Sequence, residues 1–305
     1  MRVILLGSSG QLGRSMILTK PKKIDLICPS KSELNLLDIN ECKNFISKNK
    51  PHWIINCAAY TNVDESEIER DQALKINKTI PENLANSILQ FGGKLLHIST
   101  DFVFNGDQNY PYTSYQKRSP INYYGFSKSE GEVAIEKILG KKNQALIFRT
   151  SWLMSPFGKN FLMTVLKLIQ EKDKISVVYD QIGCPTNSID LAKACWNSLE
   201  NSKIFEDEFC NNNPIPIIHW SNLGVASWFD VAISIKDLAH EIGLTNKSFF
   251  VLPIKSNQFK CRAIRPKYSL LDCEASYKVL GIRPAHWRDS IKEILLMIKK
   301  RNKSS

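Results

Sequence analysis

The chain begins Met1-Arg2-Val3-Ile4-Leu5-Leu6-Gly7-Ser8-Ser9-Gly10-Gln11-Leu12-Gly13. The apolar run over residues 3–6 predicts a buried strand, and the glycines after it predict a tight turn into a helix over 11–18. Such a turn lets backbone approach a pyrophosphate, which the free N–H groups and dipole of the helix N-terminus stabilise. A glycine triplet can also be a merely structural turn, but its place at the first strand-to-helix junction favours dinucleotide binding. The predicted binding residues of this turn are Gly7, Gly10, Gln11, Leu12 and Gly13.

The first half of the chain continues this alternation of apolar runs and helical patterns. The apolar runs cover residues 3–6, 24–28, 53–58, 95–99 and 145–148. Helical spacing covers residues 11–18, 41–48, 70–89 and 127–139, and Pro81 is expected to bend or restart the third of these helices. The rhythm predicts an α/β fold of the Rossmann type, with a doubly wound parallel sheet.

The second half is less regular. Helices are predicted over residues 159–171, 189–199, 227–242 and 287–299, and strands over 175–179 and 217–220. Ser227 is the expected N-cap of the third of these helices. We interpret this half as a smaller, irregular α/β substrate domain.

Composition excludes several classes of protein. With 305 residues, 43% hydrophobic and 23% charged, the chain can bury a sizeable core. Its net charge of +11 attracts anions, but zinc spacing, RNA-recognition aromatics and heptads are missing, so we expect no nucleic-acid partner. The eight cysteines form no C-x-x-C pair and predict reduced thiols rather than metal ligands. A strand pattern begins at Met1 and no apolar run could span a bilayer, so we expect a cytoplasmic protein without membrane contact.

The end of the second predicted strand bears on the cofactor. NAD-selective sites place an acid there, whereas this chain reads Cys28-Pro29-Ser30-Lys31-Ser32. Ser30 and Lys31 are suited to a 2′-phosphate, which favours NADPH over NADH, although an ordinary polar turn is an equal alternative. Asp38, the acid considered next, either contacts the adenosine side or caps the following helix.

A phenol and an ammonium lie four residues apart in Tyr124-Gly125-Phe126-Ser127-Lys128, on one face of a helix. A nearby cation stabilises a phenolate, so we expect Lys128 to lower the pKa of Tyr124 and make it a general acid. The alternative is a surface pair. Ser99-Thr100-Asp101, at the carboxyl end of the fourth strand where ligands of such sheets bind, favours the catalytic interpretation.

Together these motifs resemble the dTDP-4-dehydrorhamnose reductase family of extended short-chain dehydrogenases. The resemblance lies in the glycine turn, in residues 56–64 (Asn-Cys-Ala-Ala-Tyr-Thr-x-Val-Asp), in 99–106 (Ser-Thr-Asp-Phe-Val-Phe-x-Gly) and in 120–132 around Tyr124. It continues through Arg149-Thr150-Ser151-Trp152, Asp180-Gln181-x-Gly183-x-Pro185-Thr186, Asp190-Leu191-Ala192, Ser227-Trp228-Phe229 and residues 265–272, and therefore spans nearly the whole chain.

The resemblance implies a catalytic set of Thr100, Tyr124 and Lys128. Reduced nicotinamide would give hydride to the C4 ketone of dTDP-4-dehydro-6-deoxy-L-mannose, yielding dTDP-L-rhamnose, while Tyr124 protonates the alkoxide and Thr100 donates to the same oxygen. Lys128 would also hold the nicotinamide ribose. Besides the glycine turn, Ser30, Lys31, Tyr124 and Lys128, the implied cofactor-binding residues are Asp38, Ile39, Ala58, Ala59, Tyr60, Thr61 and Ile98. The implied substrate-binding residues are Val63, Thr100, Asp101 and Trp152.

Two of the substrate contacts have structural alternatives. Trp152 is expected either to stack on the thymine base or to pack between domains. Arg262 and Arg265 either meet the substrate diphosphate or form surface ion pairs. By the resemblance, residues 1–150 with 186–223 form the dinucleotide domain, and 151–185 with 224–305 form the nucleotide-sugar domain.

The sequence also departs from the family. Members often pair through a magnesium site built from acidic residues, and no such cluster is recognisable here, so we predict no metal and leave a homodimer open. Tyr115-Gln116-Lys117-Arg118 replaces acids, and Leu153-Met154-Ser155-Pro156 is an unusual continuation after Trp152. The rival functions are a nucleotide-sugar epimerase, a reductase of another 4-keto sugar, and a regulatory subunit like that of methionine adenosyltransferase. The presence of both Tyr124 and Lys128 argues against the last.

Overall fold

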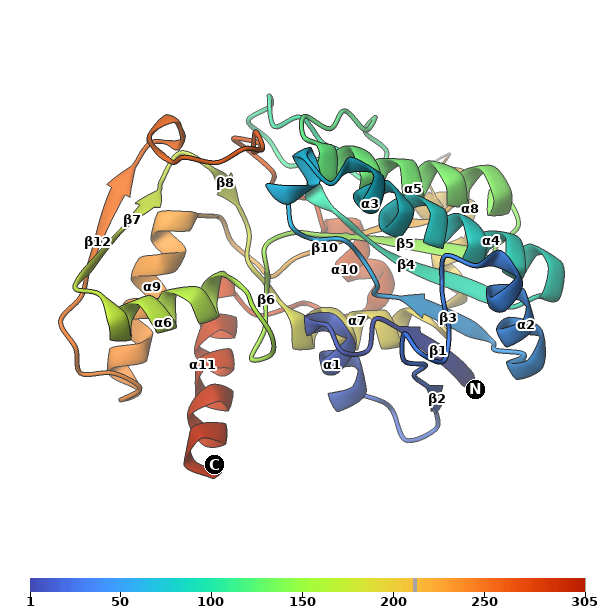
Figure 1. Cartoon of the computed structure of the whole chain (residues 1–305), viewed down its shortest axis with the longest axis horizontal. Helices are drawn as coiled ribbons and strands as arrows, with labels where there is room; N and C mark the ends of the chain where they lie inside the picture. Colours follow the sequence, from blue (N-terminus) through green and yellow to red (C-terminus); the bar gives the residue numbers. More distant parts are fainter. Residues whose placement is uncertain (211–212, 305) are drawn as a thin grey trace.

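A six-stranded parallel sheet in the order β10-β5-β4-β3-β1-β2 organises the structure, a computed structural model that describes residues 1–210 and 213–304 (Figure 1). Its strands are β1 Arg2–Leu6, β2 Asp25–Ile27, β3 Trp53–Asn56, β4 Lys94–Thr100, β5 Ala145–Thr150 and β10 Ile217–Trp220. Chain order reverses at β1, which lies between β2 and β3. The carboxyl ends of the strands beside such a reversal are where doubly wound sheets bind ligands. The predicted Rossmann-type α/β fold is confirmed, and each strand predicted for the sheet forms.

Helices cover both faces of the sheet because alternate side chains of each strand point to opposite faces. Val3 and Leu5 of β1 lie in one hydrophobic cluster with residues of α1 and α7, whereas Ile4 and Leu6 lie in another with residues of α2, α4 and α5. The bounds of these helices are α1 Gln11–Leu18, α7 Ser188–Ser198, α2 Ile39–Asn49, α4 Ile80–Phe91 and α5 Tyr123–Leu139. Both faces of β1 are therefore buried, which explains its unbroken apolar run.

The predicted helix over residues 70–89 is interrupted, as Pro81 indicates. It consists of α3 Arg70–Leu74, a π-helical turn Lys75–Thr79, and α4, which has Pro81 in its first turn. A proline in a first helical turn lacks an N–H that would have no intrahelical partner, so the helix restarts there without loss. The helix predicted over 127–139 begins earlier, at Tyr123, which places Tyr124 in its first turn.

A third hydrophobic cluster is built by helices that lie beside the sheet, to its left in Figure 1. Its helices are α6 Phe161–Glu171, α9 Trp228–Glu241 and α11 Trp287–Ser304, and the parallel pair β7 Lys174–Val178 and β12 Phe250–Ile254 adjoins them. Ser227 caps α9 as predicted: its hydroxyl accepts from the Asp230 N–H at 3.1 Å, and the Asp230 carboxylate accepts from the Ser227 N–H at 2.8 Å.

Several short elements were not predicted. They are β6 Leu153–Met154 paired with β9 Thr186–Asn187, β8 Ile182–Gly183 paired with β11 Ala226–Ser227, α8 Asp207–Cys210, α10 Glu274–Leu280, and 3-10 turns at Glu65–Glu67, Asp101–Val103, Ser202–Phe205 and Ser256–Gln258. Helix α10 lies within residues 224–305, which the resemblance places in the nucleotide-sugar domain. Its Leu280 packs in the same hydrophobic cluster as Val3 and Leu5 of β1. Across the two described ranges, no helix has the length and apolar character needed to cross a bilayer.

Candidate active site

A cleft of about 460 Å³ opens at the carboxyl ends of the central strands. Segments from Trp152 to Phe161, together with Trp228, form its opposite wall. Twelve of the predicted site residues line it: Gly10, Gln11, Leu12, Ala59, Thr61, Val63, Ile98, Thr100, Asp101, Tyr124, Lys128 and Trp152. The other eight, which do not line it, are Gly7, Gly13, Ser30, Lys31, Asp38, Ile39, Ala58 and Tyr60. The fold thus brings the proposed catalytic residues and the tip of the glycine turn to one cavity.

The glycine turn has the shape of a phosphate cradle. Gly7 has a φ of +72°, and a Cβ there would lie 2.6 Å from the Ala58 nitrogen; a Cβ on Gly13 would lie 2.2 Å from the Gly7 oxygen. These two glycines are therefore required for packing, whereas Gly10 lines the cleft as the N-cap of α1. The first turn of α1 has no acidic residue and no side-chain cap, and the buried Oε1 of Gln11 has no partner among the described residues. Free N–H groups suit the pyrophosphate of a bound dinucleotide, whereas the amide oxygen of Gln11 only accepts and suits a hydroxyl donor.

The loop after β3 is fixed by Asn77, which the sequence analysis did not single out. The Asn77 Oδ1 accepts from the Tyr60 N–H at 2.9 Å, and its Nδ2 donates to the Tyr60 oxygen at 3.0 Å and to the Ser127 hydroxyl at 2.9 Å. Asn77 lies in the π-helical turn, so its side chain connects the loop that contains Ala59 and Thr61 to α5. No local sequence pattern marks a π turn, so this role of Asn77 was not predicted.

Tyr124 is held at the start of α5 by the helix cap. Asn122 accepts from the Gly125 N–H at 2.8 Å, and the Tyr124 ring meets the Phe102 ring edge to face, with centroids 5.8 Å apart. Tyr124 and Thr100 line the same cleft, and the Thr100 hydroxyl donates to the Asp101 Oδ1 at 3.0 Å. The predicted Thr100, Asp101 and Tyr124 constellation is therefore contiguous in space.

The expected effect of Lys128 on Tyr124 is wrong for this structure. Burial raises the pKa of Tyr124 to about 12, the charge of Asp101 adds to the increase, and the hydrogen bond with Thr100 opposes it. The Lys128 amine points elsewhere: it donates to the Ile98 oxygen at 2.5 Å and lies 3.3 Å from the Nε2 of His97. Tyr124 is thus a protonated phenol at neutral pH, which is the form that a proton donor to an alkoxide must have.

Burial also perturbs the other ionisable groups of the cleft. Lys128 is 1% exposed, and burial lowers its pKa to about 8, against the opposing charges of Glu132 and Cys57. Burial raises the pKa of Asp101 to about 7, although hydrogen bonds from Ser269 and Thr100 favour its ionised form. Groups whose pKa lies this close to neutral are typical of functional sites.

One turn of α5 beyond Lys128, Glu132 is the centre of a buried ion network. Its Oε2 is 2.7 Å from Arg149 Nη2 on β5 and 3.0 Å from Arg118 Nη1. Although burial alone would raise it, these two cations bring the pKa of Glu132 down to about 2. Arg118 belongs to residues 115–118, where the sequence departs from the family. It pairs with Glu132 of α5 and does not line the cleft.

The segment predicted to face the adenosine ribose, residues 28–32, has a neighbouring carboxylate that the sequence analysis did not expect. The sequence has no acid within residues 28–32, yet the chain folds back so that the Glu33 Oε2 accepts from the Ser30 N–H at 2.8 Å. This backbone hydrogen bond, the larger effect, and a side-chain bond with Ser30 lower the pKa of Glu33, so a carboxylate does stand beside Ser30 and Lys31. Asp38 caps α2, accepting from the N–H groups of Asn40 at 2.8 Å and Glu41 at 3.2 Å, as its structural alternative required.

Trp152 lies in the cleft with one face of its ring occupied. It has a φ of +43° and stacks on Trp228, with centroids 3.8 Å apart and planes 10° apart. A Cβ on Gly183 would lie 2.7 Å from its Cε2, so the indole packs closely over β8. Arg265 and Arg262 pair with Asp64 at 2.6 Å and with Glu65 at 2.8 Å, matching the ion-pair alternative.

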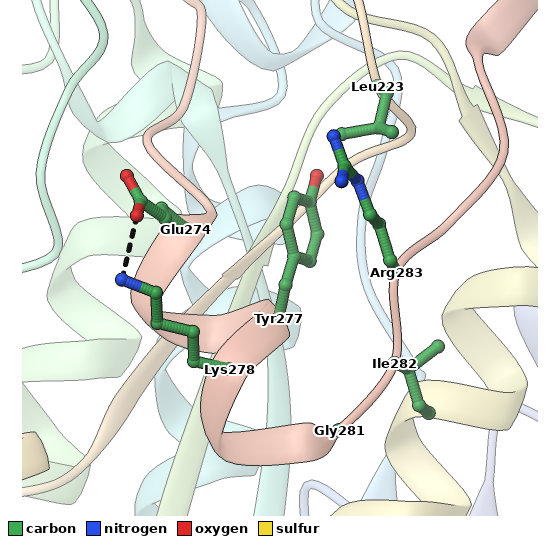
Figure 2. A pocket seen from close by; sticks show the side chains of 7 residues that line it. All are labelled: Leu223, Glu274, Tyr277, Lys278, Gly281, Ile282 and Arg283. Carbon is green, nitrogen blue, oxygen red and sulfur yellow. Dashed lines mark ion pairs between the residues drawn. The ribbon is translucent and has the colours of Figure 1, made fainter.

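Outside this cleft, the described residues form no metal cluster, and a hollow beside α10 contains an ion pair. Within the described ranges, no group of three or more His, Cys, Asp or Glu side chains could hold a metal ion. A hollow of about 570 Å³ lies beside α10 and is lined by the residues labelled in Figure 2. In this hollow Glu274 and Lys278 form an ion pair at 2.7 Å, and the Tyr277 hydroxyl donates to the Ser221 oxygen. Each of these three side chains therefore already has a polar partner.

Known proteins match this chain over nearly its full length. A family model described as the RmlD substrate binding domain matches residues 1–299. A dTDP-4-dehydrorhamnose reductase of Aggregatibacter actinomycetemcomitans is 34% identical, covering 96% of this chain and 98% of that protein. The spore coat polysaccharide biosynthesis protein SpsK of Bacillus subtilis is 35% identical, covering 96% of each. A crystal structure of dTDP-4-dehydrorhamnose reductase from Bacillus anthracis in complex with NADP has a TM-score of 0.86 at 34% identity, covering 97% of this chain and 99% of that one.

The doubly wound sheet, the glycine turn and the Thr100, Tyr124 and Lys128 cluster define an extended short-chain dehydrogenase/reductase. Within that class, the chain belongs to the RmlD substrate binding domain family, which contains dTDP-4-dehydrorhamnose reductases. This is a family of NAD(P)H-dependent sugar reductases, so the predicted oxidoreductase class and the resemblance are confirmed.

Proposed function

We propose that this protein reduces the C4 ketone of dTDP-4-dehydro-6-deoxy-L-mannose to give dTDP-L-rhamnose, with NADPH as the preferred reductant and NADH as the alternative. The observation that carries the proposal is the convergence of Thr100, Tyr124 and Lys128 with the glycine turn in one cleft. The relatives named as dTDP-4-dehydrorhamnose reductases and the NADP complex support the choice of substrate and cofactor.

In the proposed reaction, the bound nicotinamide supplies hydride to the C4 carbon. Tyr124 gives its phenolic proton to the carbonyl oxygen as negative charge develops there, and Thr100 donates a hydrogen bond to the same oxygen. Both side chains already line the cleft, and the Thr100 hydroxyl turns from its bond to the Asp101 Oδ1 toward the substrate oxygen. Lys128 holds the nicotinamide ribose from the floor of the cleft.

The remaining assignments are carried over from the family resemblance. Gly7, Gly10, Gln11, Leu12 and Gly13 hold the pyrophosphate, Ser30 and Lys31 face the adenosine ribose, and Ile39, Ala58, Ala59, Tyr60, Thr61 and Ile98 border the cofactor. Val63, Asp101 and Trp152 meet the nucleotide-sugar. We also propose that residues 151–185 with most of 224–305 act as the substrate domain. A homodimer is compatible with this arrangement.

The direct test supplies the 4-keto-L-sugar nucleotide with each reduced cofactor, follows loss of reduced-nicotinamide absorbance, and identifies the product sugar. Stoichiometric oxidation of NADPH with formation of dTDP-L-rhamnose is the expected result. Epimerisation without net cofactor consumption would identify an epimerase, and turnover only of other 4-keto sugars would identify a different reductase. Failure to turn over any of these while a partner protein is bound would favour the regulatory role.

A further inference from the structure

A buried histidine, His97, lies directly behind Lys128. It belongs to β4 and is 0% exposed, as is Asn56 at the end of the neighbouring strand β3. The His97 Nε2 is 3.3 Å from the Lys128 Nζ, and its Nδ1 is 3.1 Å from the Asn56 Nδ2. The imidazole therefore bridges the proposed catalytic amine and the strand that leads into the cofactor loop.

The direction of these hydrogen bonds is set by the backbone of Ala58. Its N–H donates to the Asn56 Oδ1 at 3.1 Å, which turns the amide nitrogen of Asn56 toward His97. An amide nitrogen can only donate, so the His97 Nδ1 accepts and the ring proton lies on Nε2. The ring is neutral, because burial holds the pKa of His97 well below its usual value, and a protonated Lys128 lowers it further.

An Nε2–H group facing Lys128 suits a neutral amine and not an ammonium. A neutral amine accepts from Nε2–H through its lone pair while donating to the Ile98 oxygen, so every bond from Ala58 to Ile98 runs in one direction. An ammonium has no lone pair, and its contact with Nε2 requires the proton to move to Nδ1. The Asn56 amide must then turn over and give up its bond from Ala58.

We propose that His97 is the positioning residue of Lys128, because its ring holds the amine against β4. The tautomer of His97 changes with the charge of that amine, and the change alters the hydrogen bond of Asn56 to the loop that begins at Ala58. The inference rests on the proposed function only in taking Lys128 as a working group of the cleft. It deepens that function, because the geometry of the loop after β3 then depends on whether Lys128 is charged.

Other charges near Lys128 do not replace this contact. Glu132 on α5 acts on Lys128 through space and favours its protonated form, as Cys57 after β3 would do only as a thiolate. Glu132 is already bonded to Arg149 and Arg118, and the Cys57 thiol is kept protonated by burial, which raises its pKa to about 12. The bonds that the amine makes are to His97 and Ile98.

The test is the tautomer of His97, read from long-range 1H–15N correlations of the imidazole nitrogens between about pH 6 and 10. His97→Gln assigns the resonance among the five histidines. We expect an Nε2–H ring at high pH that changes to Nδ1–H at the midpoint of Lys128, which its lowered pKa places near 8. Lys128→Met should abolish the inflection, and Asn56→Asp, whose carboxylate accepts from Nδ1–H, should move it up by at least about one pH unit. A ring that keeps one tautomer throughout would overturn the proposal.

Kinetic variants separate positioning from packing. His97→Gln keeps a donor and an acceptor, whereas His97→Phe keeps only bulk. We expect His97→Phe to move the pH midpoint of kcat/KM for NADPH by at least about one unit and His97→Gln to restore it toward that of the unmodified chain. His219→Gln, which removes another fully buried imidazole outside the cleft, is the control for stability and should leave the midpoint in place. Equal midpoints in all three variants would also contradict the proposal. Retained turnover in Lys128→Met would instead refute the proposed catalytic role of Lys128, while the NMR result would stand.

Discussion

The two walls of the cleft differ in how their side chains are held. On the sheet wall, Lys128 is buried and bonded to residues of β4, and Glu132 behind it is ion-paired. On the opposite wall, Trp152 stacks on Trp228, which Phe161 meets edge to face at 4.7 Å. Polar bonds fix direction and protonation state, whereas aromatic packing fixes shape. Under the proposed function, the chemistry belongs to the first wall and recognition of the nucleotide-sugar to the second.

The walls are joined by Phe157, whose ring lies between two cations. The Arg14 guanidinium of α1 is 4.6 Å from its centroid, and the Arg301 guanidinium of α11 is 5.0 Å from it. The loop after Trp152 therefore rests on the helix that follows the glycine turn. Variants in each wall show whether the two functions are as separate as the packing indicates.

The largest effect is expected from Tyr124→Phe on the sheet wall. Removing the proton donor should lower kcat by about 10²–10⁴-fold and leave NADPH affinity nearly unchanged, because the phenol acts mainly in the transition state. Steady-state kinetics and a cofactor titration measure both. Tyr123→Phe, in the adjacent position and outside the cleft, is the matched control. A loss below about tenfold would remove Tyr124 as the general acid.

Arg149→Met tests the support beneath that wall. It leaves Glu132 buried with less compensation and should lower the free energy of unfolding by about 3–5 kcal/mol at neutral pH. In the unmodified folded chain the pKa of Glu132 is about 2, below the usual value of a glutamate in an unfolded chain. The ionised Glu132 therefore stabilises the fold fully at pH values above that usual pKa, and this stabilisation is lost as the pH falls toward 2. In the variant that pKa rises, and the stability difference should shrink on acidification.

Urea unfolding at neutral pH and near pH 4 measures the Arg149→Met difference. Arg2→Met, which breaks an exposed pair with Asp25, is the control and should cost no more than about 1 kcal/mol. A difference between Arg149→Met and the unmodified chain that grows on acidification would contradict this assignment of Glu132.

Trp152→Ala tests the aromatic wall. If the exposed part of the indole stacks on thymine, binding of dTDP should weaken by roughly 1–3 kcal/mol while NADPH affinity stays the same. Titration calorimetry with dTDP and a melting curve on the same variant separate recognition from packing. Trp228→Ala removes the ring beneath and should weaken dTDP binding less. Unchanged dTDP affinity in Trp152→Ala, with a stability loss of about 3–5 kcal/mol, would make Trp152 a packing residue only.

The smallest effect is expected at Glu33. Glu33→Gln removes the carboxylate beside Ser30 and should shift the ratio of kcat/KM values toward NADPH by no more than a few-fold, since solvent screens an exposed charge. Glu200→Gln, on the remote surface, is the control. A shift toward NADH would show that Glu33 does not act on the 2′-phosphate.

Local patterns predicted the parts of the molecule that depend on neighbours in sequence. The apolar runs gave the strands of the sheet, Ser227 gave the cap of α9, and Pro81 gave the restart of α4. The spacing of Tyr124 and Lys128 placed them on one helix. These features were accessible because strand alternation, helix caps and i, i+4 neighbours are encoded within a few residues.

The sequence by itself determined the sheet, the glycine turn and the chemical types available to the cleft. Only the tertiary structure decided their partners: His97 behind Lys128, the Glu33 carboxylate beside Ser30, and Trp228 beneath Trp152. It also decided the protonation state of Tyr124, because burial outweighs the expected influence of Lys128. The physical reason is that strand register and helix docking set which distant side chains meet and how far water is excluded, and neither is encoded in the spacing of nearby residues.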